Sequence, residues 1–262
     1  MTPLDIITWG AGESVVLVHG SLIDGPATWA HQRPLAERWC LRVVQRRGFG
    51  SSPRADGEDF EHDAEDLCDL LAEPAHLVAH SYGAIGALLA AARRPRAVRS
   101  LTLVEPTSVT AGMDEPEVAQ AIGSISDWWL HAPRDPAKFL VDYSALLGVR
   151  VPRSDDGPAG LREAAHYLRH CRPPWTAEIP WVDVAEAGIP TLVISGAHTP
   201  ALDAVADAVA RRTGGAHIVI SSSGHAVQRS ARNFNRALED HLLAARSRSL
   251  SARRANGGGA SR

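Results

Sequence analysis

The stretch HLVAHSYGAIGALLAAA at residues 76–92 decides the fold. An apolar run typical of a buried strand enters AHSYG (residues 79–83), and a run of small and apolar residues typical of a helix follows. A serine on such a tight turn holds its Oγ clear of the sheet, and the first N–H groups of the helix point at any negative charge formed there. The turn is crowded, so it needs small residues two positions before and after the serine, here Ala79 and Gly83. The stretch therefore predicts that Ser81 is a nucleophile.

Apolar, β-branched runs of about five residues recur on both sides of this turn. They are continuous rather than alternating, which is typical of strands covered on both faces. Helical patterns with one apolar face separate most of them, as in 62–72, 201–212 and 233–245. Strands that alternate with helices predict an α/β fold with a mostly parallel, doubly wound sheet. The expected strands are 14–18, 41–45, 76–79, 100–104, 191–195 and 217–221.

The alternation stops between the fourth and fifth expected strands, at about residues 107–188. This part of the chain has helix-like pieces, many prolines and a concentration of large aromatic rings that need an apolar surface to bury against. We expect a helical cap there, inserted into a core formed by 1–106 and 189–245. Residues 246–262 have no acid and a Gly-Gly-Gly run, so we expect a disordered tail. The aromatic residues of the expected cap are Trp128, Trp129, Phe139, Tyr143, Tyr167, Trp175 and Trp181.

Composition excludes several classes of protein. A chain of 262 residues with 45% hydrophobic residues can bury one large core, and a net charge of −3 without a basic stripe argues against nucleic-acid binding. No apolar run approaches the roughly 20 residues that span a bilayer. The first ten residues, MTPLDIITWG, lack the pattern of a signal peptide. We therefore expect a cytoplasmic protein, a monomer or homodimer, with no membrane or nucleic-acid partner.

The turn at Ser81, together with VVLVHGSLIDGPATW at residues 15–29, resembles the α/β-hydrolase family, and the resemblance extends over most of residues 14–245. It implies an α/β-hydrolase fold in which two backbone N–H groups form an oxyanion hole. These are the N–H of Tyr82 and the N–H after His-Gly, at Ser21 or less plausibly Leu22. This chain departs from the family pattern at Ala79, where the family usually has Gly, and the difference is one methyl group.

The resemblance also implies a catalytic histidine on a loop after the last strand. SSSGHAVQRS at residues 221–230 places His225 after a glycine and before the final expected helix. The chain has 12 histidines, and His225 combines position, preceding glycine and following helix. His19 is expected to stabilise its turn, and His80 to be a packing residue at the end of its strand.

The acid of a catalytic triad holds the imidazole in the correct tautomer and stabilises the imidazolium. Family members most often place an Asp after the strand that corresponds to 191–195, where this chain has Thr199. Some members take the acid from the preceding strand, and here that strand ends on Glu105. The carboxyl end of this strand opens onto the same crevice. We expect Glu105 to be the acid. Asp203, or a dyad without an acid, stays open as an alternative.

These residues predict a serine hydrolase that cleaves an ester, lactone or thioester of a small, largely apolar substrate through Ser81, His225 and Glu105. C–C bond hydrolysis on the same framework and a ligand-binding protein without turnover are the alternatives. No metal, nucleotide or flavin motif occurs, so neither a metal nor a cofactor is expected. The expected pocket residues are Leu22, Trp128, Trp129, Phe139 and Tyr143.

Overall fold

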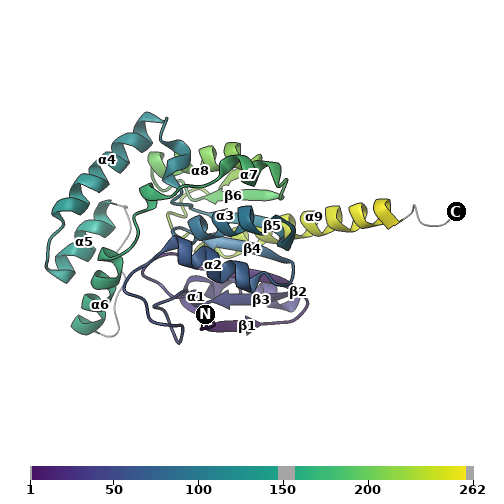
Figure 1. The fold of residues 1–262 in the computed structure, drawn as a ribbon, viewed down its shortest axis with the longest axis horizontal. Coiled ribbons are helices and arrows are strands. Elements are labelled where there is room, and N and C mark those ends of the chain that lie inside the picture. The colour runs from purple at the N-terminus through teal and green to yellow at the C-terminus, as the bar shows by residue number, and fades with distance from the viewer. Residues whose placement is uncertain (1, 147–156, 258–262) are drawn as a thin grey trace.

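The computed structural model describes residues 2–146 and 157–257, and its centre is a seven-stranded sheet (Figure 1). The strand order is β1-β3-β2-β4-β5-β6-β7, and every neighbouring pair is parallel except β1 with β3. β4 and β6 are buried along their whole length, as continuous apolar runs require. The predicted mostly parallel α/β sheet is confirmed. The strands are β1 (Ile6–Trp9), β2 (Glu13–Val18), β3 (Trp39–Val44), β4 (Ala75–His80), β5 (Val98–Val104), β6 (Thr191–Ser195) and β7 (Ala216–Val219).

The edge strand β1 is absent from the sequence prediction. It has four residues, IITW, and pairs antiparallel with β3 from Ile6 opposite Val44 to Trp9 opposite Leu41. Only one of its faces meets the core, so it lacks the continuous apolar run by which the other strands are recognised. A short, half-buried edge strand carries too weak a pattern to be identified from sequence.

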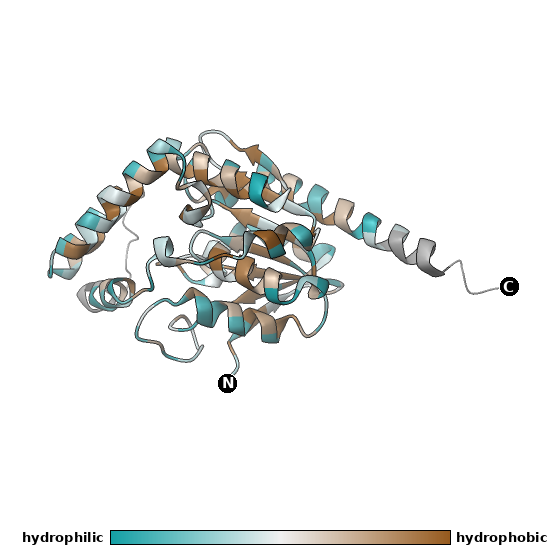
Figure 2. Ribbon diagram, turned by 45° about the horizontal axis from the view of Figure 1, so that its top comes forward, coloured by the Kyte–Doolittle hydropathy of each residue, from teal (hydrophilic) through white to brown (hydrophobic). Residues whose placement is uncertain are grey.

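Two groups of helices cover the two faces of the sheet. α2 (Phe60–Leu70), α3 (Gly83–Arg93), α7 (Trp181–Glu186) and α8 (Pro200–Thr213) share one apolar cluster with one face. α9 (Arg232–Gly257), with the short helices α1 (Gly25–Thr28), η1 (Ala30–Glu37) and η5 (Val227–Ser230), covers the other. The predicted apolar faces point inward, since Leu67, Val209 and Leu238 are at most 1% exposed. Figure 2 shows the apolar residues gathered at the centre of the molecule.

Three helices form an insertion at one end of the molecule: α4 (Pro116–His131), α5 (Pro136–Leu146) and α6 (Gly157–Arg169) (Figure 1). The insertion has an apolar cluster of its own around Phe139, Leu140 and Leu168. Val118 and Ile122, near the start of α4, instead join the cluster of the main core. The insertion therefore packs on the body of the molecule at the base of α4 and through Tyr167 of α6, whose ring lies 5.5 Å from that of Phe49, and around its own aromatic centre elsewhere. The short helices η2 (Pro95–Ala97), η3 (Val109–Gly112) and η4 (Pro174–Thr176) complete the described elements.

The final helix is longer than the sequence predicted. We expected a disordered tail from residue 246, but α9 continues to Gly257 and projects from the end of the molecule opposite the insertion (Figure 1). Residues 246–256 contain neither proline nor glycine, and Ala, Arg and Leu favour helix there. Residues 258–262 of the expected tail lie outside the described residues. Of the helices described, none is long and apolar enough to cross a membrane.

The burial pattern of α9 divides it into a structural half and a dispensable half. Phe234, Leu238 and Leu242 are completely buried, whereas residues 246–249 are exposed. We predict that Leu238→Ala lowers the free energy of unfolding by about 2–5 kcal/mol, because it leaves a cavity in the core. Urea-induced unfolding followed by circular dichroism measures the change.

Truncation after Arg246 is the matched comparison. It removes no residue of the core cluster, so we expect the free energy of unfolding to change by less than about 1 kcal/mol. A truncated chain as unstable as Leu238→Ala would contradict this division of the helix.

Candidate active site

Ser81 lies on the sharp turn between β4 and α3, in a conformation that few residues other than glycine adopt. Its φ angle is +53°, and its N–H donates to the carbonyl oxygen of Val104 at 2.9 Å. Its own carbonyl oxygen accepts from the N–H of Ala84 at 3.0 Å, which starts α3. Backbone strain of this kind costs about 1–3 kcal/mol and persists only where the surroundings enforce it. The turn therefore presents the Ser81 side chain at the carboxyl edge of the sheet.

Two glycines allow the loop after β2 to touch the Ser81 turn. A Cβ atom on Gly83 would lie 2.4 Å from the carbonyl oxygen of His19, and one on Gly20 would lie 2.7 Å from the Cβ of Ser81. No side chain fits at either distance, so the two turns meet backbone to backbone. Ala79, where the family pattern has glycine, is fully buried in β4. The close approach places Ser21 beside Ser81.

His225 and Glu105 complete a chain of hydrogen bonds that begins at Ser81. The Nε2 atom of His225 lies 2.9 Å from Ser81 Oγ, and its Nδ1 atom lies 3.2 Å from Glu105 Oε2. A carboxylate accepts only, so Nδ1 carries the proton and Nε2 is free to accept from the serine hydroxyl. The structure thus brings together the three residues that the sequence singled out, from three different loops.

Glu105 follows β5 and is held from two sides. Its side chain is completely buried, and its Oε1 accepts from the N–H of Gly196 at 2.6 Å. Its own backbone N–H donates to the carbonyl oxygen of Ile194 at 2.8 Å, and its φ angle is +47°. Each carboxylate oxygen therefore has a hydrogen-bond partner, which offsets the cost of burial.

The loop after β6, where the family pattern has an aspartate, makes other hydrogen bonds here. Gly196 donates to Glu105, and its carbonyl oxygen accepts from the N–H of Gly224 at 3.2 Å. Thr199 caps α8 by accepting from the N–H of Leu202 at 3.2 Å. Asp203 lies in the first turn of α8, and in the described part of the chain its carboxylate makes no hydrogen bond or ion pair with His225.

His80 holds the loop of His225, which the sequence did not indicate. We expected it to be a packing residue, but it lines the cavity at Ser81, and its Nε2–H donates to the carbonyl oxygen of His225 at 2.9 Å. Burial, followed by the neighbouring His225, lowers the pKa of His80 to about 3, so it stays neutral near pH 7. A neutral imidazole one residue before the serine therefore holds the backbone of the histidine loop.

His19 lies beneath the turn that carries Ser21. Its Nδ1–H donates to the carbonyl oxygen of Gly20 at 2.7 Å, and its Nε2 accepts from the N–H of Arg46 at 3.1 Å. Burial and the positive charge of Arg46 lower the pKa of His19 well below its ordinary value. The ring is therefore neutral and braces the turn. The N–H groups of Ser21 and Tyr82, both in residues that line the cavity, donate to no other described residue.

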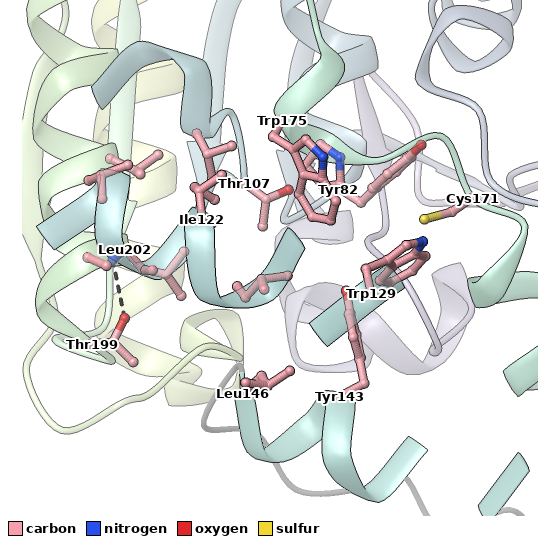
Figure 3. A pocket seen from close by; sticks show the side chains of 17 residues that line it. Tyr82, Thr107, Ile122, Trp129, Tyr143, Leu146, Cys171, Trp175, Thr199 and Leu202 are labelled. Atoms are coloured by element: carbon pink, nitrogen blue, oxygen red, sulfur yellow. Dashed lines mark hydrogen bonds between the residues drawn. The ribbon is translucent and has the colours of Figure 1, made fainter. Parts of the chain in front are cut away.

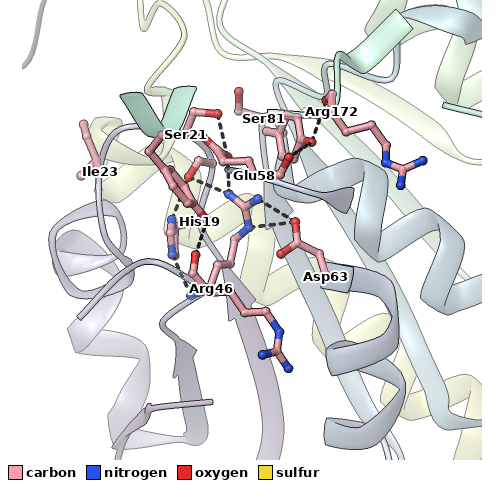
Figure 4. A network of polar contacts seen from close by, with 12 residues as sticks. His19, Ser21, Ile23, Arg46, Glu58, Asp63, Ser81 and Arg172 are labelled. Atoms are coloured by element: carbon pink, nitrogen blue, oxygen red, sulfur yellow. Dashed lines mark hydrogen bonds and ion pairs between the residues drawn. The ribbon is translucent and has the colours of Figure 1, made fainter. Parts of the chain in front are cut away.

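A buried ionic network fixes the same turn from below. The Arg46 guanidinium lies between Glu58 and Asp63 (Figure 4). Its Nη1 is 2.8 Å from Glu58 Oε2, and its Nη2 is 2.6 Å from Asp63 Oδ2. Burial would lower the pKa of Arg46, but Asp63 and Glu58 raise it well above its ordinary value. Glu58 Oε2 also accepts from the Ser21 hydroxyl at 3.0 Å. The network therefore links the Ser21 loop to the segment before α2.

Tyr82 extends this network to the chain that returns from the insertion. Its hydroxyl lies 2.8 Å from the carbonyl oxygen of Arg172 and 3.1 Å from that of Glu58. The N–H of Arg172 donates to the carbonyl oxygen of Glu58 at 2.7 Å. Both cavity-lining turns are thereby anchored to one buried cluster.

The site opens into a cavity of about 430 Å³, and a smaller apolar compartment of about 90 Å³ adjoins it. Figure 3 shows the residues that line the smaller compartment. Tyr82, Thr107, Tyr143 and Pro174 line both. The remaining lining of the compartment is almost entirely apolar and includes Ile122, Trp129, Trp175 and Leu202. The space available therefore has one polar end at Ser81 and one apolar end between α4 and α8.

The expected pocket residues divide into two groups. Leu22 and Tyr143 line the large cavity, and Trp129 with Tyr143 lines the apolar compartment. Trp128 and Phe139 line neither, because they pack on each other at 5.3 Å inside the insertion. Successive residues of a helix point about 100° apart, so Trp128 and Trp129 cannot both face the cavity. Sequence reasoning missed Ile122, Trp175, Leu202, His198 and Arg229 as lining residues.

No group of His, Cys, Asp or Glu side chains within 2–146 and 157–257 has an arrangement that could hold a metal ion.

Two characterised proteins are similar to this chain at low identity. A pimeloyl-[acyl-carrier protein] methyl ester esterase from Aeromonas salmonicida is 26% identical over 163 residues, which is 61% of this chain and 62% of that protein. The serine hydrolase BPHL from Mus musculus is 27% identical over 252 residues, which is 89% of this chain and 80% of that protein. The chain thus spans less than two thirds of the first relative's length.

Solved structures share the fold. An esterase from Thermogutta terrifontis superposes with a TM-score of 0.64 at 20% identity, covering 92% of this chain and 93% of that one. At this identity the likeness concerns the fold alone. Residues 15–237, however, match the family model described as the alpha/beta hydrolase family, and this range contains the turn at Ser81, Glu105 and His225. The chain belongs to the alpha/beta hydrolase family.

Proposed function

We propose that this protein is a serine hydrolase of carboxylic esters. The observation that carries the proposal is the continuous chain from Ser81 Oγ through the His225 ring to the Glu105 carboxylate, at 2.9 and 3.2 Å. A nucleophile, a base and a group that orients the base, each within hydrogen-bond reach of the next, are the requirements of covalent acyl transfer. The similarity to an esterase and a serine hydrolase supports this reaction class.

Acylation begins when Ser81 Oγ attacks the ester carbonyl carbon and passes its proton to His225 Nε2. The carbonyl oxygen becomes an oxyanion, which the N–H groups of Ser21 and Tyr82 stabilise. Each donor lowers the activation barrier by roughly 3–4 kcal/mol. Glu105 stabilises the imidazolium through Nδ1–H. When the C–O bond breaks, His225 returns its proton to the leaving alcohol, and the acyl group remains on Ser81.

Deacylation repeats these steps with water. His225 removes a proton from the water molecule, whose oxygen attacks the acyl carbon, and then protonates Ser81 Oγ as the carboxylic acid leaves. Lactones and thioesters present the same carbonyl group to the same atoms. The apolar compartment beside Thr107 fits an apolar acyl group, so the substrate class is a small ester with an apolar acyl part.

We predict that a fluorophosphonate probe labels the wild-type protein and does not label Ser81→Ala. The probe forms a covalent adduct only with a serine that a neighbouring base activates. Gel fluorescence of purified protein provides the measurement, and circular dichroism shows that the variant is folded. Failure of the folded wild-type protein to react would instead support a ligand-binding protein without turnover.

Glu105→Gln is expected to lower kcat for a chromogenic ester by at least about 100-fold. The amide has one acceptor oxygen, and if Gly196 N–H takes it, the NH₂ group faces His225 Nδ1. Nδ1 then becomes the acceptor, Nε2 carries the proton, and the ring can no longer act as a base.

Asp203→Asn is the matched control, since it makes the same change of atoms on the other candidate acid. Its kcat should stay close to the wild-type value. Loss of activity in Asp203→Asn with retention in Glu105→Gln would show that the acid has been assigned to the wrong residue.

Glu58→Gln tests whether the buried network positions the oxyanion hole. The change removes the negative charge that receives both Ser21 Oγ–H and Arg46. We predict that kcat falls about tenfold with little change in KM, because a displaced donor loses part of the stabilisation that it gives the transition state. Steady-state kinetics on a chromogenic ester checks this.

Asp66→Asn serves as the control, because it disrupts the neighbouring Arg47–Asp66 pair at 2.7 Å and leaves the contacts of Glu58 with Ser21 and Arg46 in place. If both variants lowered kcat equally, the effect would be one of general stability.

A further inference from the structure

The large cavity has a cationic side that the proposed mechanism does not use. Arg229 lines the cavity together with His225, Gln228 and Ser223. Among the described residues that line it, none is an aspartate or glutamate. Glu105 and Glu58 lie behind its wall and are almost completely buried, at 1% exposure each. The cavity therefore presents a positive side chain to its contents without an acidic residue to neutralise it.

Arg229 is held at this place by its backbone. It belongs to η5, and its N–H donates to the carbonyl oxygen of Ala226 at 2.9 Å. The preceding residue, Gln228, is buried, and its carbonyl oxygen accepts from Gln32 Nε2 at 2.9 Å. The turn is thus fixed while the Arg229 side chain is exposed. In the part of the chain that the structure describes, its guanidinium makes no ion pair.

The charge of Arg229 reaches the groups around Ser81. It is one of the causes, after burial and His225, that lower the pKa of His80. A charge that acts on His80 also acts on a ligand in the same cavity, although solvent screens part of it because the Arg229 side chain is exposed. An anionic group bound there would gain from this field.

The geometry indicates which end of an ester meets Arg229. His225 Nε2 protonates the leaving alcohol in the proposed reaction, so the leaving group lies on the side of His225. Arg229 follows His225 by four residues on the same segment between β7 and α9, and both residues line the cavity. The apolar compartment is reached past Tyr82 and Thr107 instead. The acyl part and the leaving group thus meet surfaces of different character.

We propose that Arg229 forms an anion-binding subsite for the leaving group, so that the enzyme prefers esters of an apolar acid with an alcohol that carries a carboxylate or phosphate. This inference rests on the proposed ester hydrolysis and adds its substrate class. A guanidinium suits both anions, because its planar fork of N–H donors matches their oxygen atoms.

The test compares butanoyl esters of 4-hydroxybenzoate, 4-hydroxyphenyl phosphate and 4-hydroxybenzamide, two anionic alcohols and a neutral one of similar shape. For each anionic ester, kcat/KM is divided by kcat/KM for the amide ester. This ratio is compared between wild type and Arg229→Gln, so differences in intrinsic reactivity cancel. We expect the ratio to fall about fivefold in Arg229→Gln for at least one anion, the size of a partly exposed charge pair. The anionic ester whose ratio falls further shows whether a carboxylate or a phosphate fits the subsite better.

Two further variants sharpen the test. Arg229→Lys keeps the charge and should retain part of the preference. Arg232→Gln removes an exposed arginine that does not line the cavity and should leave the ratio unchanged. Added salt should reduce the wild-type preference, since it screens the charges.

A ratio that is the same in wild type and Arg229→Gln for both anions would overturn the subsite while leaving the hydrolase intact. If the folded wild-type protein cleaved neither the charged esters nor the neutral one, the proposed function would fail, and the subsite with it.

Discussion

The buried carboxylate of Glu105 joins the loops on which the arrangement of the site depends. One oxygen accepts from Gly196 at 2.6 Å, and the other meets His225 Nδ1 at 3.2 Å. Gly196 in turn accepts from Gly224, the residue before His225. A Cβ on Gly196 would lie 2.2 Å from the carbonyl oxygen of Gly224, so the two loops touch only because this residue is glycine. The loop after β6, which has Thr199 in place of an aspartate, thus supports through Gly196 a glutamate one strand away.

The other half of the site depends on backbone contacts that tolerate no added atoms. Gly20 and Gly83 let the Ser21 loop and the Ser81 turn meet, and Leu22, Ser81 and Glu105 all have positive φ angles. Strain at these residues is sustained by the sheet beneath them, whose central strands are almost completely buried. A stable core therefore maintains a strained edge, and the reactive groups lie at that edge. The ionic network around Arg46 adds a second layer of support below the same loops.

The sequence predicts most strongly where local pattern and chemistry coincide. Strands β4, β5 and β6 could be located because they are almost completely buried, and β2, β3 and β7 because they carry short runs rich in apolar and β-branched residues, whereas the short edge strand β1 could not. Ser81 and His225 each lie beside a small residue or glycine that a tight turn requires. The position of Glu105 next to His225 follows only from the order of strands, which a fold resemblance supplies. Side-chain directions are set by tertiary packing, which the sequence does not show. Trp128 and Phe139 were therefore expected at the pocket but line neither cavity, whereas Leu202 of α8 and Arg229 of η5 were overlooked.

The central claim is that Glu105, rather than an acid on the β6 loop, orients the imidazole of His225. The most direct measurement is the proton NMR signal of the His225 Nδ1–H, which shifts far downfield when that proton is shared with a carboxylate. The account predicts this signal in the wild-type protein and in Asp203→Asn, and its loss in Glu105→Gln. A downfield signal that persists in Glu105→Gln and disappears in Asp203→Asn would contradict it.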